Sequence, residues 1–91
     1  MHVEYRRAVG AVWRHGHGGV LVLMEPGRDV VVLSGGAADV WSALAEPRTV
    51  DDLGRTLATT YTRPADEMTA DVAPLVDDLV ERGVVDRVVT P

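Results

Sequence analysis

The residues of this chain that could do chemistry begin with two histidines in a glycine-rich stretch. His15 and His17 are one residue apart, and alternate side chains of an extended strand point to the same side, so the pair could bind one metal ion. A stable site needs further ligands, and the only other histidine is His2. The surrounding glycines instead suit a tight turn. We therefore predict a turn here and no metal site.

Paired carboxylates occur twice, at Asp51-Asp52 and Asp77-Asp78. Catalytic carboxylates need burial or a close like charge to shift their pKa, and adjacent residues on a helix do not face each other. Ser34 has neither a neighbouring histidine nor the Gly-x-Ser-x-Gly context of a nucleophile. The glycine-rich stretches also lack the lysine of a phosphate-binding loop. We therefore predict that the chain is not an enzyme and needs no cofactor.

Three short strands are expected to come first and to form an antiparallel meander. They are Val9–Arg14, which alternates in polarity, and the apolar runs Val20–Met24 and Asp29–Leu33, with a turn at Pro26-Gly27 between the last two. Strands two and three are apolar on both faces. One face must cover the helices, so the other is either covered by something else or partly open.

Three helices follow, each with a recognisable start or stop. Ser34 suits the N-cap of the first, which Pro47 ends, and Thr49 with Asp52 resembles a capping box at the start of the second. Apolar residues at helical spacing in the first helix, Trp41 among them, indicate a buried stripe.

The third helix is expected to run from Pro64 or Ala65 to Arg82, with Gly83 just past its end. Pro74 lies inside it and predicts a kink or a restart. Residues 84–85 and 88–89 are expected to form a short terminal strand or a packed tail.

Composition narrows the function classes. Ninety-one residues support one domain, residues 1–91, and the chain has no cysteine. The N-terminus lacks the apolar core of a signal peptide, and the longest apolar run is too short to cross a bilayer, which predicts a cytoplasmic protein without a membrane partner. A net charge of −5 argues against nucleic-acid binding.

Charge is distributed unevenly along the chain. Arg6, Arg7 and Arg14 make the N-terminal stretch basic, whereas seven acids from Asp66 onward face only two arginines. A basic sheet edge beside an acidic helix would orient a charged peptide. The alternative is that both are ordinary solvated faces.

Four segments in order carry a resemblance to a known family. They are Val32–Trp41, Arg48–Leu53, Ala70–Val72 and Leu79–Val85, within a span of roughly residues 9 to 86. Together they resemble the PqqD-like family, the RiPP recognition elements that serve ribosomally made, modified peptides. The family usually has asparagine where this chain has Ser34, and its third helix rarely carries a proline.

The resemblance implies an α+β fold, a three-stranded antiparallel sheet followed by three helices in a winged-helix-like layout. It also implies a function, because family members bind the leader segment of a precursor peptide and present it to modifying enzymes. The leader adds as an antiparallel strand to the edge of strand three, in a groove against helix three. Stand-alone copies of this length resemble the recognition subunit of lasso-peptide pathways, beside a leader peptidase and a cyclase.

The expected peptide-binding residues lie on strand three and helix three. On strand three they are Val30, Val31, Val32 and Leu33, of which one parity should face the groove, although the sequence leaves open which. On helix three they are Asp71, Val72, Leu75, Val76, Asp78 and Leu79, the two acids being placed to meet basic leader residues.

Several alternatives stay open at this point. A peptide chaperone in pyrroloquinoline quinone synthesis would share every feature above. A winged-helix DNA-binding protein would need a basic recognition helix, and helix three is acidic. Two further classes remain. One is a small enzyme, and the other is a structural subunit that pairs with itself through the open edge.

Overall fold

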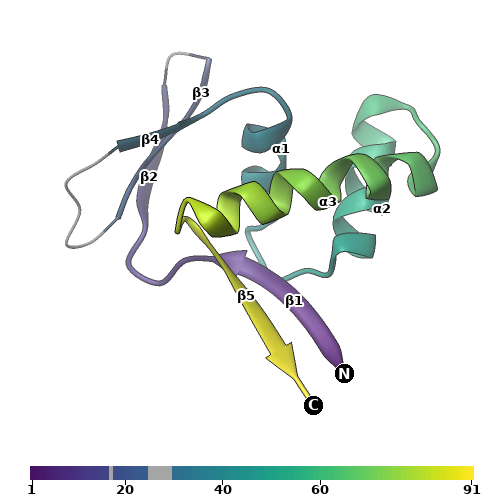
Figure 1. The fold of residues 1–91 in the computed structure, drawn as a ribbon. Coiled ribbons are helices and arrows are strands. Elements are labelled where there is room, and N and C mark those ends of the chain that lie inside the picture. Colours follow the sequence, from purple (N-terminus) through teal and green to yellow (C-terminus); the bar gives the residue numbers. More distant parts are fainter. Residues whose placement is uncertain (17, 25–29) are drawn as a thin grey trace.

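The structure, a computed structural model, describes residues 1–16, 18–24 and 30–91 of the chain. Figure 1 shows the elements in their order along the sequence. They are β1 (His2–Arg7), β2 (Val12–Gly16), β3 (Gly19–Leu23), β4 (Val30–Leu33), α1 (Gly36–Ala43), α2 (Val50–Tyr61), α3 (Ala65–Glu81) and β5 (Val85–Thr90). The predicted α+β class and the three helices are confirmed.

The antiparallel sheet β2-β3-β4 is the predicted meander. Its first strand was predicted too early, because β2 begins at Val12 and Val9 is 78% exposed. Gly10 has a φ of 88°, a left-handed conformation that turns the chain between Val9 and Ala11. The alternation of polarity over Val9–Arg14 therefore includes a turn before the strand and does not mark the start of the strand. The expected turns at His17 and at Pro26-Gly27, and the first residue of strand three, Asp29, lie outside the described residues.

A second sheet joins the two ends of the chain. β1 pairs antiparallel with β5 from His2↔Thr90 to Arg7↔Val85, and Figure 1 shows the termini side by side. The terminal strand was one of the two predicted outcomes for residues 84–89, whereas β1 was not predicted. Arg6 and Arg7 consequently lie on β1 and not on the three-stranded sheet, so the expected basic sheet edge is wrong for them.

The start of α1 differs from the expected cap. Gly35, not Ser34, is the N-cap residue, with φ 56° and ψ −131°, and no side chain makes a capping hydrogen bond. The next residue, Gly36, approaches α3 closely, since a Cβ there would lie 3.0 Å from Cδ1 of Leu75. The start of α1 therefore depends on a close approach to α3, which the absence of a side chain at Gly36 allows.

The start of α2 is the predicted capping box. Thr49 Oγ1 accepts a hydrogen bond from the Asp52 backbone N–H at 3.0 Å, and the Asp52 carboxylate accepts one from the Thr49 N–H at 3.4 Å. These bonds to Thr49 lower the pKa of Asp52. Further along α2, a Cβ at Gly54 would lie 2.8 Å from Cα of Thr69, so α2 and α3 cross as closely as only glycine permits.

Pro74 does not divide α3. The helix is continuous over Ala65–Glu81, so the predicted restart is wrong. Both Pro74 and Ala70, whose carbonyl loses its helical partner, are on the exposed side of the helix, so the helix can continue without burying an unpaired carbonyl. Gly83 adopts a φ of 81° just after the helix, as predicted.

One core joins the inner faces of the sheets to the three helices. Trp41, which was predicted to be buried, is 0% exposed. The buried cluster consists of Tyr5, Val20, Val22, Leu33, Val40, Trp41, Leu44, Leu53, Leu57, Met68, Val72, Val76, Leu79, Val84 and Val85.

Candidate functional site

The strand β4 lies at an edge of its sheet. Among the residues that the structure describes, its strand neighbour is β3, and nothing pairs with its other side. The chain's own C-terminal strand pairs with β1 instead. The free side of β4 is therefore a row of backbone groups open to an added strand.

The strand register tells which backbone groups of β4 point outward. Gly16 pairs with Gly19, and with only two residues between them this closing pair must exchange hydrogen bonds. Alternation along β3 then makes Val20↔Leu33 and Val22↔Val31 hydrogen-bonded pairs.

The position of Leu33 agrees with this assignment. Its carbonyl group points at β3, where a Cβ on Gly19 would collide with the oxygen and lie 3.1 Å from the carbon. The backbone N–H and C=O groups of Val31 and Leu33 are thus engaged by β3, and those of Val30 and Val32 point to the open edge.

The same strand has two unlike faces. Leu33 is 1% exposed and Val31 packs against the core, whereas Val30 and Val32 are each 57% exposed. The parity that the sequence left open is therefore resolved, with Val31 and Leu33 turned toward the helices. Val30 and Val32 stand on the opposite, outer face of the sheet.

One side of α3, which carries both apolar and acidic residues, faces the segment that follows β4. Leu75 is half-buried against Gly36, and Asp71 lies one turn before it and Asp78 one turn after it. The side of α3 that includes Thr69 packs instead against α2 at Gly54. One apolar residue between two acids thus stands beside the end of β4.

A shallow hollow of about 170 Å³ opens along this side of α3, three residues past the end of β4. It is mainly apolar, and Tyr61 at its side donates a hydrogen bond to Asp39. Its lining residues are Gly36, Leu57, Tyr61, Arg63, Met68, Asp71, Val72 and Leu75. Five of these eight (Gly36, Leu57, Tyr61, Arg63 and Met68) were not predicted as site residues, because three separate helices bring them together.

Both predicted acids already have arginine partners. Arg63 donates to Asp71 at 2.8 Å and lies 3.5 Å from Glu67, and its hydrogen bond to Asp71 raises the pKa of Arg63. Asp78 pairs with Arg82 at 3.0 Å, one turn further along α3. A basic ligand residue would therefore compete with these arginines for partly exposed carboxylates.

Burial divides the ten predicted binding residues. Val30, Val32 and Asp71 are exposed, and Val31, Leu75 and Asp78 are half-buried. The other four, Leu33, Val72, Val76 and Leu79, are at most 1% exposed. Three of the apolar residues expected to contact the ligand, Val72, Val76 and Leu79, are therefore not accessible to it, because they form the core and support the hollow from below.

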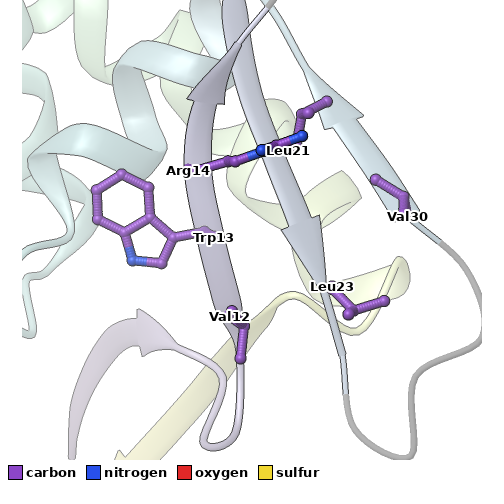
Figure 2. A pocket seen from close by; sticks show the side chains of 6 residues that line it. All are labelled: Val12, Trp13, Arg14, Leu21, Leu23 and Val30. Atoms are coloured by element: carbon purple, nitrogen blue, oxygen red, sulfur yellow. The ribbon is translucent and has the colours of Figure 1, made fainter.

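A second hollow lies on the outer face of the three-stranded sheet (Figure 2). Its volume is about 270 Å³, and Val12, Arg14, Leu21, Leu23 and Val30 line it together with Trp13. In Figure 2 the Trp13 ring points away from the other five side chains. The partly open face that the sequence allowed is therefore present.

Other chemistries find little support in the described part of the chain. There, no group of three or more His, Asp or Glu side chains is arranged to hold a metal ion. No helix in the same residues is long and apolar enough to span a bilayer. Of the paired acids considered above, Asp52 serves a helix cap and Asp78 an ion pair.

Comparison with known families agrees with this architecture. The family described as "Coenzyme PQQ synthesis protein D (PqqD)" matches residues 20–85, well over half of the chain. The chain therefore belongs to the PqqD family, and the resemblance found in its sequence is confirmed. A search of curated proteins finds no significant match.

Two solved structures share the fold. One, described as "TbiB1 in Complex with the TbiA(beta) Leader Peptide", has a TM-score of 0.74 at 16% identity, over 89% of this chain and 94% of that one. The other is the solution structure of the PqqD truncation of Methylobacterium extorquens PqqCD, described as a stand-alone RiPP recognition element. It has a TM-score of 0.72 at 20% identity, over 91% of this chain and 88% of that one.

Proposed function

We propose that this chain binds the leader segment of a ribosomally made precursor peptide as an antiparallel strand added to β4. The observation that supports this most directly is the orientation of the edge. Val30 and Val32 direct their N–H and C=O groups outward, and the hollow at Leu75 opens three residues past the end of the same strand. Strand addition draws affinity from such backbone groups and specificity from pockets for alternate side chains.

The energetics suit a reversible carrier. Each backbone hydrogen bond contributes a net stabilisation of about 0.5–1.5 kcal/mol. The two N–H and two C=O groups of Val30 and Val32 can form only a few such bonds with a guest strand. Ordering a disordered leader costs free energy. The balance gives an affinity between nanomolar and micromolar, tight enough to retain a precursor and weak enough to release the product.

In this role the chain is not a catalyst. It raises the local concentration of the precursor at a partner enzyme, in the cytoplasm. The fold shared with TbiB1, whose structure contains a leader peptide, supports leader binding. A lasso-peptide pathway, with a leader peptidase as the partner, is the assignment that the resemblance of the sequence implies. The affinity for the precursor then depends on this chain, and bond cleavage depends on the peptidase.

A second candidate is a peptide chaperone in pyrroloquinoline quinone synthesis. The description of the matching family favours it. Both candidates use the same edge, so they differ only in the peptide bound. Titrating the chain with the leader of a short precursor encoded beside it and with the peptide precursor of the quinone distinguishes them by relative affinity.

The test deletes one outward N–H at each edge of the sheet. Proline at an outward-pointing edge position removes a donor without breaking the ladder to the neighbouring strand. Val32→Pro does this on β4, and His15→Pro is the matched variant on β2, where Trp13 and His15 point outward. Synthetic leaders of short reading frames next to this chain's gene, labelled with fluorescein, serve as probes in a polarisation titration.

We expect Val32→Pro to weaken binding by roughly tenfold or more, since one bond is lost and a guest carbonyl is left without its partner. His15→Pro should change the affinity by less than about twofold. Circular dichroism of both variants checks that the fold is intact. Equal effects of the two folded variants would mean that β4 is not the binding edge.

A further inference from the structure

The outer face of the three-stranded sheet is apolar and uncovered by any described residue. In register, one row runs Val12, Leu23, Val30 and the next runs Arg14, Leu21, Val32. Val12, Val30 and Val32 are 57–59% exposed. Arg14 is opposite Leu21 in register and is exposed, and both line the hollow shown in Figure 2.

This face ends at the edge to which the guest strand would add. Side chains of a strand alternate between the two faces of its sheet, so half of the guest's side chains must stand on the outer face. The guest residues opposite Val30 and Val32 form the hydrogen-bonded pairs, because those two valines direct their backbone groups outward. Their side chains therefore lie next to Val30 and Val32, about 5.5 Å away between Cα atoms.

We propose that Val30 and Val32, backed by Leu21 and Leu23, form a second recognition surface for the guest strand. It would select apolar side chains at two alternate positions, i and i+2, of the bound segment. This inference rests on the proposed function and deepens it. The ligand class is an extended segment that is apolar toward the solvent face of the sheet as well as toward α3.

The size of the face favours this occupant over a whole protein. Three strands of four or five residues cover about 14 Å by 15 Å, roughly 200 Å². A standard interface needs about 800 Å² from each partner. Two or three side chains of an adjoining strand fill the smaller area, and their attachment to the β4 edge supplies the remaining contacts.

The test begins with selection of ligands. A displayed library of random 12-residue peptides is selected on the wild-type chain and counter-selected on Val32→Pro, so that only peptides dependent on the β4 edge are retained. We expect the enriched peptides to share apolar residues two positions apart, in addition to those for the α3 side. One enriched peptide is then synthesised with a fluorescent label.

Matched valine-to-threonine variants then locate the contact. The double variant Val30→Thr/Val32→Thr keeps β-branched side chains next to the guest but makes them polar. Val12→Thr changes an equally exposed residue about 14 Å from the guest position. We expect the double variant to bind the peptide about two- to thirtyfold more weakly, from the usual strength of two cross-strand pairs. Val12→Thr should change binding by less than about 1.5-fold.

A variant of the enriched peptide completes a double-mutant cycle with the valine variants. Replacing its two outward apolar residues by serine should weaken binding to the wild type, and the remaining affinity should no longer respond to Val30→Thr/Val32→Thr. Edge-dependent peptides without this alternation, or equal effects of the double variant and Val12→Thr, would overturn the inference and leave the proposed function standing. Wild-type dimers in light scattering that both valine-to-threonine variants dissociate would overturn it in favour of a second copy. Enriched peptides that bind Val32→Pro normally would overturn the proposed function itself.

Discussion

The two edges of the three-stranded sheet present the same kind of backbone to different surroundings. Just past the end of β4, the hollow at Leu75 and Gly36 opens on the inward side. At the β2 edge the inward side is bordered by the chain's own side chains. The Arg7 guanidinium lies 4.5 Å from the ring centre of Trp13 and 5.0 Å from that of Trp41.

Arg7 also ends a helix there. Its Nε and Nη2 donate to the Trp41 carbonyl at 3.1 and 2.8 Å, in the last turn of α1. A cation at this place satisfies a terminal carbonyl and favours the helix dipole. The rings of Trp13 and Trp41 meet edge to face at 6.1 Å. The β2 edge is thus tied to β1 and α1.

The two unpaired ladders thus differ in what surrounds them. Both edges offer backbone donors and acceptors. In the described residues, Arg7 and Trp41 pack against Trp13 of β2, whereas the hollow at Leu75 opens just past the end of β4. Substitutions beside β4 should therefore change affinity, and substitutions beside β2 should change stability.

The largest expected effect comes from charge on α3. Leu75→Asp places a carboxylate in the hollow, and we expect at least a tenfold loss of leader affinity with the fold retained, since Leu75 is half-buried. Polarisation titration measures the affinity. Ala70→Asp, which adds the same charge to an exposed position of the same helix, is the control and should bind normally.

The neighbouring position separates affinity from folding. Val72 is 0% exposed, so Val72→Asp leaves an unpaired charge in the core and should abolish the cooperative thermal transition. A folded Val72→Asp protein would show that the helix does not pack as described. Unchanged affinity of folded Leu75→Asp would exclude the hollow as part of the site.

The matching change beside β2 is expected to act on stability. Arg7→Met keeps much of the side-chain volume but removes the charge that contacts both rings and the Trp41 carbonyl. We expect a loss of about 2 kcal/mol in the free energy of unfolding, measured in urea. Leader affinity should stay within twofold. A large loss of affinity without a loss of stability would reverse the roles of the two edges.

The smallest effect is expected for the acids of α3. Asp71→Asn and Asp78→Asn each remove a carboxylate that Arg63 or Arg82 already engages. Partly exposed ion pairs contribute about 0.2–1 kcal/mol, so affinity for a basic leader should fall less than about threefold at near-physiological salt. A tenfold loss would mean that the leader displaces the arginines.

Local features of the fold were predictable from the sequence. Thr49 and Asp52 cap α2 through groups three residues apart, and Gly83 ends α3 through its own φ angle. The apolar runs at residues 20–23 and 30–33 identified β3 and β4. These features depend on hydrogen bonds and periodicities within a few residues, which sequence patterns contain.

The candidate site was only partly predictable. The sequence placed it on β4 and α3 but assigned Val76 and Leu79 to a ligand, although both are core residues. An apolar stripe has the same pattern whether it faces the protein or a guest. What decides between them is the neighbouring element, and here α2 and the sheet cover that stripe.

By itself, then, the sequence determined the class of the fold, its family and the strand that carries the open edge. Only the tertiary structure decided that the C-terminal strand pairs with β1, that Val30 and Val32 face outward, and that Leu75 borders a hollow. The physical reason is the distance along the sequence over which each interaction acts. Capping and turn residues act on neighbours in the chain, whereas strand partners and burial depend on segments that meet only when the whole core packs.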